Sequence, residues 1–308
     1  MGLKISLLFV GRKAMDIIMN EFKSYHPIVN FTYFIFVIGF SCFFMHPVCL
    51  VISLACAFLY SVMLKGVKAV RTNLIYMVPM LIAMAVINPL FNHEGIRVIA
   101  YLPNGNPVTF ESIIYGISAA TMIVSVICWF SCYNEVMTSD KFIYLFGRII
   151  PAMSLIISMT LRLVPRFAYQ LKVVTNAQRC IGRDASKGNL IRRARNGFNI
   201  LSILITWALE NAIETADSMK ARGYGLSGRT SFSIFTFDKR DKKVLICILL
   251  SGVYIISGNI MGGIDFQYFP CIKASDVSLF GISIFLAYLF LCICPVILEI
   301  WEVRKWKS

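Results

Sequence analysis

The residues best placed to do chemistry are arginines near the ends of two polar helices. The second helix closes with Ala221-Arg222-Gly223, and the first closes with a phrase that holds Arg179 and Gly182. A planar guanidinium at a helix end can form two parallel hydrogen bonds to a partner's carboxylate, a geometry that lysine cannot copy. A plainer interpretation also fits, in which a cation in the last turn offsets the helix dipole and glycine ends the helix. Spacing alone leaves both interpretations open.

Other reactive residue types do not group into a site. Ten cysteines are scattered mostly through apolar runs, where a free thiol packs as a small hydrophobe. Cys128 and Cys132 stand at helical spacing, but no histidine or carboxylate accompanies them. The sequence contains no Gly-x-x-x-x-Gly-Lys-Ser/Thr loop for ATP and no convincing Ser/His/Asp or Cys/His group. We therefore predict no catalytic residues, no cofactor and no metal site.

The composition is that of a membrane protein. Of 308 residues, 58% are hydrophobic and 15% are charged, whereas soluble domains have about 25% charged residues. Six apolar runs approach the roughly 17–25 residues that a helix needs to cross a bilayer. They are 28–45, 48–64, 74–91, 112–133, 244–260 and 278–298. The predicted fold is all-α and polytopic, with about six spanning helices and a cytoplasmic module of two long amphipathic helices.

The distribution of basic residues predicts the topology. If the six runs cross the membrane one after another, all Lys and Arg except Arg97 and Lys273 lie on the same side of it. Excess positive charge marks the cytoplasmic side, so both termini are expected in the cytoplasm. The loop after the third run is rich in β-branched residues around a Pro-Asn-Gly-Asn-Pro turn and predicts a small external hairpin. The segment between the last two runs is expected to be an external loop.

A basic segment separates the two groups of spans. Residues 162–243 hold sixteen Lys and Arg against six Asp and Glu, which is ten of the fourteen net positive charges. The apolar run 142–161, which precedes this segment, is long enough to cross the membrane. Crossing would place the basic segment outside the cell, so we expect the run 142–161 to lie along the cytoplasmic interface. Helices are predicted over 165–182 and 199–222. The expected divisions are 1–141, 142–243 and 244–308.

With these motifs in place, the chain resembles the transmembrane T component of energy-coupling factor (ECF) importers. The best match is Ala221-Arg222-Gly223 at the end of a long amphipathic helix, followed by Tyr224-Gly225. Further phrases of the family are matched along the whole chain. They are Asn88-Pro89-Leu90, Leu161-Arg162-Leu163-Val164-Pro165, Ala177-Gln178-Arg179 and the exit from Gly228-Arg229-Thr230 to Asp238-Lys239-Arg240-Asp241.

The resemblance implies a non-catalytic scaffold in a prokaryotic cell membrane that takes part in vitamin or metal import. In the family, two Ala-Arg-Gly signatures end two helices that cross in an X, and each arginine contacts one of two cytoplasmic ATPases. Arg222 takes the second position directly. At the first position Cys180-Ile181-Gly182 replaces the signature, and either Arg179 or Arg183 is left to supply the charge.

The resemblance also implies a separate membrane subunit, the S subunit, that captures the substrate. Methionine side chains form adaptable contact surfaces, and we expect Met153, Met159 and Met219 to face that subunit. The sequence does not identify the transported substrate, because in this family another chain reads it.

Two rival functions remain, a self-sufficient channel or secondary transporter and an intramembrane enzyme. None of the six runs contains Asp, Glu, Lys or Arg, the groups on which ion-coupled carriers depend. An enzyme would need clustered polar residues at the membrane face. The basic loop with Arg192, Arg193 and Arg195 either contacts anionic lipid headgroups, which we favour, or a partner protein. Nucleic acid is not expected as a partner, because topology already explains the charge.

Overall fold

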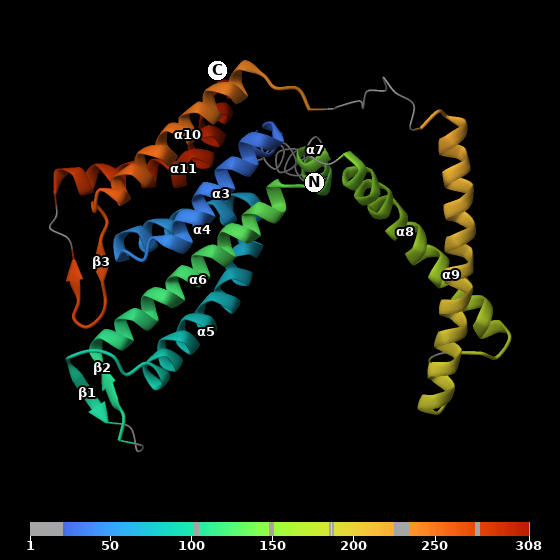
Figure 1. Ribbon diagram of the computed structural model, residues 1–308, viewed down its shortest axis with the longest axis horizontal. Helices are drawn as coiled ribbons and strands as arrows, with labels where there is room; N and C mark the ends of the chain where they lie inside the picture. Colours follow the sequence, from blue (N-terminus) through green and yellow to red (C-terminus); the bar gives the residue numbers. More distant parts are fainter. Residues whose placement is uncertain are drawn as a thin grey trace, which may run out of the picture. The chain divides into compact units, whose positions relative to one another are not determined.

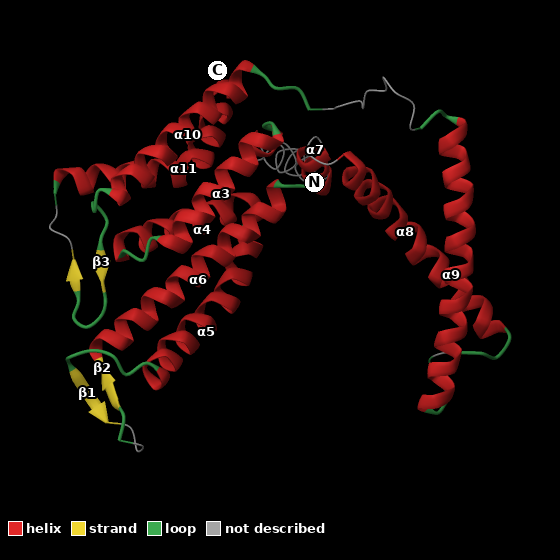
Figure 2. Cartoon of the chain, in the orientation of Figure 1, coloured by secondary structure: helices red, strands yellow, loops and turns green. Residues whose placement is uncertain are grey.

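The computed structural model describes residues 21–101, 105–147, 151–184, 186, 188–224, 235–274 and 278–307. These residues are almost entirely helical, with two short strand pairs (Figure 2). They fall into two compact units, which we describe separately. The first unit comprises Met1–Lys141 and Phe235–Ser308, and the second comprises Phe142–Ile234.

The first unit is a bundle of apolar helices (Figure 1). Its helices are α2 (Glu21–Ser24), α3 (Pro27–Phe43), α4 (Pro47–Lys65), α5 (Val67–Phe91), α6 (Phe110–Val136), α10 (Lys239–Ile260) and α11 (Leu279–Lys307). α6 packs on α3, α4 and α5, and α11 packs on α4 and α10. In the described chain four helices are long and apolar enough to cross a membrane, namely α4, α6, α10 and α11. The predicted all-α membrane fold is confirmed.

The number of spans stays a prediction. Pro27–Phe43 and Met77–Phe91 are apolar but shorter than the four long helices. At 1.5 Å per residue Pro27–Phe43 reaches only about 26 Å, less than the roughly 30 Å hydrocarbon core, whereas Met77–Phe91 is the apolar part of the 25-residue helix α5. These two segments correspond to the first and third predicted spans.

Histidine-proline pairs set the starts of α3 and α4. His26 and His46 are the N-cap residues, and each ring accepts a hydrogen bond through Nδ1 from the backbone N–H two residues on, at 3.3 and 3.2 Å. Pro27 and Pro47 follow at the first helical position, where proline needs no N–H partner. The predicted separation of the runs 28–45 and 48–64 is confirmed.

The core of the first unit combines large aromatic rings with hydroxyl groups that bond one another. Trp129, fully buried, donates from Nε1 to Ser53 Oγ at 3.0 Å. Ser53 lies 2.6 Å from Ser41 Oγ, which lies 3.2 Å from the hydroxyl of Tyr288. Buried polar groups are tolerated when they are hydrogen-bonded. This ladder joins α3, α4, α6 and α11 at one level of the bundle.

Polar contacts also tie the N-terminal helices to α10. The backbone N–H of His26 donates to Asp241 Oδ1 at 3.2 Å, and Arg240 lies 3.7 Å from Glu21 and over the ring of Tyr25 at 4.4 Å. The residues from Phe235 onward therefore belong to the first unit, whereas the sequence grouped them with the basic segment. The functional division into three chain segments stays a prediction.

Two antiparallel strand pairs extend from helix ends in the first unit. β1 (Val98–Tyr101) pairs with β2 (Pro107–Thr109), in register Val98 to Thr109 and Tyr101 to Pro107. The predicted hairpin is thus confirmed. β3 (Phe266–Gln267) pairs with β4 (Lys273–Ala274) in a segment that the sequence predicted only as a loop.

The second unit holds the end of α7 (Ser139–Gly147) and the two long helices α8 (Pro151–Cys180) and α9 (Leu190–Ala221). The predicted starts of both long helices are wrong. The run 142–161 contributes to α7 and α8, and its position along the cytoplasmic interface stays a prediction. The first long helix begins at Pro151, so Pro165 lies inside it. Proline removes one backbone hydrogen bond but does not end a helix whose flanking turns continue. The second helix also begins earlier than predicted, at Leu190 with Asn189 as its N-cap.

Candidate coupling site

The two long helices cross and contact each other along part of their length (Figure 1). The predicted crossing is observed. Three buried apolar side chains, Val174, Ile200 and Leu204, form the cluster between them. Leu171, Leu201 and Ile205 on the same two helices stay exposed by 46%, 50% and 51%. The apolar surface of each helix is therefore wider than the strip that the crossing covers.

Polar contacts hold the pair on both sides of this cluster. On one side, Arg166 Nη1 donates to Asn211 Oδ1 at 3.1 Å and lies 5.7 Å from the Trp207 ring, against which Phe167 packs edge-on at 5.3 Å. On the other side, Asn196 Nδ2 donates to the carbonyl oxygen of Asp184 at 3.0 Å. The helices are thus antiparallel where they meet and are fixed at two separated levels.

This arrangement places the C-terminal ends of the two helices far apart. The end of α8 lies beside Asn196, because the residue that Asn196 binds follows α8 by only a few positions. Arg222 comes about 26 residues after Asn196, so at about 1.5 Å per residue α9 separates them by about 40 Å. The crossed pair therefore has one capped helix end at either extremity.

We call residues 219–224 the second helix end. Gly223 has φ +73°, its N–H donates to Lys220 O at 2.9 Å, and the N–H of Tyr224 donates to Met219 O at 3.0 Å. This is the glycine cap that the plainer interpretation predicted. Ala221 and Arg222 are exposed, and no ion pair of Arg222 exists within the described residues. Capping uses the backbone here, so the guanidinium remains available to a partner.

We call residues 178–183 the first helix end. Gly182 has φ +75°, its N–H donates to Arg179 O at 3.0 Å, and the N–H of Arg183 donates to Gln178 O at 2.9 Å. Ile181 is 63% exposed. Cys180 and Arg183 are exposed as well.

Arg179 is bound within its own chain. Its Nε lies 3.3 Å from Asp184 Oδ1, which also accepts hydrogen bonds from the backbone N–H and hydroxyl of Ser186 at 2.9 and 2.8 Å. The two bonds from Ser186, and then the Arg179 charge, hold the pKa of Asp184 below its usual range. The Asp-x-Ser spacing is a sequence signal for such a turn, whereas nothing in the sequence pointed to Asn196.

The remaining predicted site residues are methionines on the same two helices. Met159 and Met219 are half-buried within the second unit, and the side chain of Met153 lies outside the described ones. Further large apolar side chains on these helices are exposed by 41% to 71%, including Ile156, Leu161, Val164, Phe198, Ile203, Leu209 and Ile213. A surface of this kind marks contact with protein or lipid.

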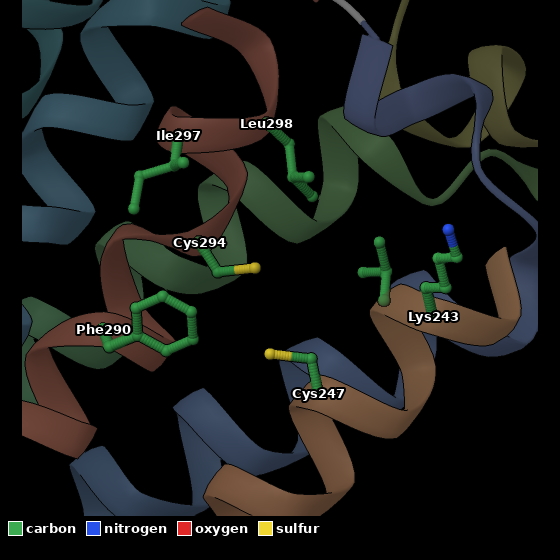
Figure 3. A pocket seen from close by; sticks show the side chains of 7 residues that line it. Lys243, Cys247, Phe290, Cys294, Ile297 and Leu298 are labelled. Carbon is green, nitrogen blue, oxygen red and sulfur yellow. The ribbon is translucent and has the colours of Figure 1, made fainter. Parts of the chain in front are cut away.

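The first unit contains an apolar cavity of about 190 Å³ between α10 and α11, in which the thiols of Cys247 and Cys294 point into the same space (Figure 3). Its other lining residues are Lys243, Val244, Phe290, Ile297 and Leu298. One charged side chain at the rim suits an apolar occupant better than a polar solute. Among the described residues, no group of three His, Cys, Asp or Glu is placed to hold a metal ion.

Comparison with known proteins identifies the family. The sequence model for CbiQ, described as a cobalt transport protein, matches residues 20–232. The chain belongs to the CbiQ family. With its long apolar helices, it is a membrane-embedded, multi-pass protein.

Curated relatives agree with this assignment and with the predicted resemblance, which is confirmed. The chain is similar to the energy-coupling factor transporter transmembrane protein EcfT of Lactobacillus helveticus, with 38% identity over 33% of this chain and 38% of the relative. EcfT of Bacillus selenitireducens is 32% identical over 36% of this chain and 42% of the relative. EcfT of Lactococcus lactis is 29% identical over 34% and 40%. The chain thus matches about two fifths of the length of these relatives.

Proposed function

We propose that this CbiQ-family chain is the T component of an ECF-type ABC importer. In this role it catalyses no reaction itself. It couples ATP hydrolysis by two cytoplasmic ATPases to a membrane-embedded S subunit that binds a vitamin or a metal ion. The observation that carries the proposal is the crossed helix pair, with a glycine-capped end at each extremity about 40 Å from the other.

The second helix end is the clearest contact for an ATPase. Ala221 and Gly223 leave the Arg222 guanidinium exposed at the point where α9 stops. A carboxylate on the ATPase would accept two hydrogen bonds from it. The first helix end contacts the other ATPase through a cation on one side of Gly182, which is either Arg179 or Arg183.

The helix pair would transmit motion because it is fixed at two levels. The bonds from Arg166 to Asn211 and from Asn196 to Asp184 would oppose sliding of one helix along the other. When the ATPases close on ATP, a displacement of the two ends therefore turns the pair as a frame. The exposed apolar surface, with Met153, Met159 and Met219, is the surface on which we place the S subunit.

The membrane orientation belongs to the same proposal. Both termini and the helix pair lie on the cytoplasmic side of a prokaryotic cell membrane, because almost all Lys and Arg fall on the segments assigned there. The arginines at positions 192, 193 and 195 are all exposed near the start of α9. They contact anionic headgroups, at about 1 kcal/mol each.

Purification of the tagged, full-length protein in mild detergent, with mass spectrometry of the proteins that accompany it, tests this function. We expect ATPases with Walker motifs and a small membrane protein in defined stoichiometry. A protein that purifies alone and transports solute in liposomes would instead support a stand-alone carrier. Chemical turnover by the isolated chain would support the intramembrane enzyme.

A further inference from the structure

The two helix ends have the same backbone but different side chains. Gly182 and Gly223 have φ of +75° and +73°, and each cap contains the same two hydrogen bonds, from glycine to the residue three positions back and from the next residue to the one five back. The caps therefore align residue by residue, with Cys180 on Ala221 and Ile181 on Arg222. The residue after the glycine is Arg183 at the first end and Tyr224 at the second.

In this alignment the cation and the large apolar or aromatic residue lie on opposite sides of the glycine in the two helix ends. The first end reads Ile-Gly-Arg and the second reads Arg-Gly-Tyr. All four flanking side chains are exposed, Ile181 by 63% and Tyr224 by 49%. Each end thus presents one cation and one large apolar or aromatic side chain, but in opposite order.

The alignment also decides between the two candidate cations at the first end. Arg179 aligns with Lys220, one turn before the glycine, and its Nε is bound to Asp184. Arg183 follows the glycine and is exposed, and no ion pair is formed by it within the described residues. Arg183 is therefore the first end's available guanidinium, and it stands where the second end has Tyr224.

We propose that the first helix end binds an ATPase surface with an apolar pocket for Ile181 and a carboxylate for Arg183, the reverse of the order at Arg222. This inference rests on the proposed function. One ATPase surface does not fit both ends. A guanidinium in the apolar pocket is desolvated without a partner, and isoleucine against the carboxylate leaves a buried charge unpaired. The two ATPase chains therefore differ at this surface.

Photocrosslinking from the two aligned positions tests the difference. p-Benzoylphenylalanine replaces either Cys180 or Ala221 in the full-length protein in cell membranes, and captured chains are identified by mass spectrometry. We expect two different Walker-motif ATPases, one from each position. Capture of the same ATPase from both positions overturns the inference but leaves the proposed function intact. Capture of no ATPase from either position contradicts the proposed function itself.

An exchange of side chains makes the test specific to the order. In the Ile181→Arg, Arg183→Tyr variant the first end gains the second end's sequence. We expect position 180 to capture predominantly the ATPase that position 221 captures, with the ratio of the two chains changed by about tenfold or more. An unchanged ratio, with capture from 221 retained as proof of folding, overturns the inference.

Two matched substitutions by a neutral residue test which arginine of the first helix end binds the ATPase, and they leave Ile181 and Gly182 unchanged. Arg183→Gln should lower capture of the first ATPase by about tenfold or more, because it removes a charged contact across an interface. Arg179→Gln removes the same charge four residues earlier and should leave capture within about twofold. A larger loss for Arg179→Gln than for Arg183→Gln contradicts the assignment.

Discussion

The two units differ in the size of their apolar cores. In the first unit, Trp129, Tyr33, Tyr60 and Tyr288 are fully buried in one continuous core. In the described part of the second unit, the apolar core consists of three residues between α8 and α9. Most large apolar side chains of those two helices remain exposed. The first unit has an extensive core of its own, whereas the described core of the second is small.

The polar groups of the two units also differ, because the buried ones lie mainly in the first unit and those of the second are mainly exposed. In the first unit the hydroxyls of Ser41, Ser53 and Tyr288 are buried and bond one another. In the second unit the polar side chains at the helix ends are exposed, and the polar bonds between the helices set their crossing. A bundle with a hydrogen-bonded polar core thus contrasts with a helix pair that is joined by a few polar bonds and has an exposed surface.

The largest expected effect lies in the core of the first unit. Trp129→Ala should lower the free energy of unfolding by about 3–5 kcal/mol, because it leaves a cavity and removes the bond to Ser53. Circular dichroism during titration with SDS measures this change. Ile213→Ala on α9, where the side chain is 65% exposed, should change stability by less than about 0.5 kcal/mol. Similar losses for the two variants would contradict the comparison.

A smaller and more local effect is expected in the second unit. Leu204→Ala removes one of three buried side chains and should weaken the α8–α9 contact by about 2 kcal/mol, near the lower limit for leucine because little surrounds the site. Hydrogen exchange should accelerate in α8 and α9 and stay unchanged in α4 and α6. Acceleration in all four helices would mean that the two units unfold together.

The hydrogen bonds among Ser41, Ser53, Tyr288 and Trp129 should contribute less to the free energy of unfolding than the apolar core of either unit. Ser53→Ala leaves Trp129 Nε1 without its acceptor and removes one neighbour of Ser41, which should cost about 1–2 kcal/mol. The same SDS titration measures it, with Ser53→Cys as a control that keeps a weak acceptor. A Ser53→Ala protein as stable as the wild type would show that the ladder is replaceable by packing.

The smallest effect concerns the turn after the first helix end. The pKa of Asp184 is lowered, so the ionised carboxylate stabilises this turn at neutral pH, and that stabilisation is lost as pH falls through the lowered pKa. After correction for intrinsic exchange, the protection of the Ser186 amide should fall on acidification. Asp184→Asn should remove this pH dependence. An equal dependence in the variant would assign it to another group.

Local signals accounted for what the sequence predicted well. The length of the apolar runs, the proline after His46 and the turn residues between β1 and β2 act on neighbouring residues, so the helices, their break and the hairpin were predictable. The prediction of a helix start at Pro165 failed because the helix continues on both sides of this proline. Pro165, predicted as the start of the helix, is an interior residue of α8.

Contacts between distant residues were not predictable from one sequence. The bond from Trp129 to Ser53 joins residues 76 positions apart, and that from Arg166 to Asn211 joins residues 45 apart. The glycine caps were predicted individually. Their residue-by-residue equivalence, and hence the exchange of Ile181 and Arg183 against Arg222 and Tyr224, required the backbone hydrogen bonds. The roles of these residues in binding ATPases stay predictions.

The retention of ATPases by charge-reversed variants tests the central claim most directly. Arg222→Glu and Arg195→Glu make the same change at two exposed arginines of the second unit, one at the helix end and one assigned to lipid headgroups. Both proteins should insert into membranes and purify normally. We expect Arg222→Glu to lose ATPase by about tenfold or more and Arg195→Glu to keep it. Equal retention by the two variants would contradict the coupling role of the helix ends.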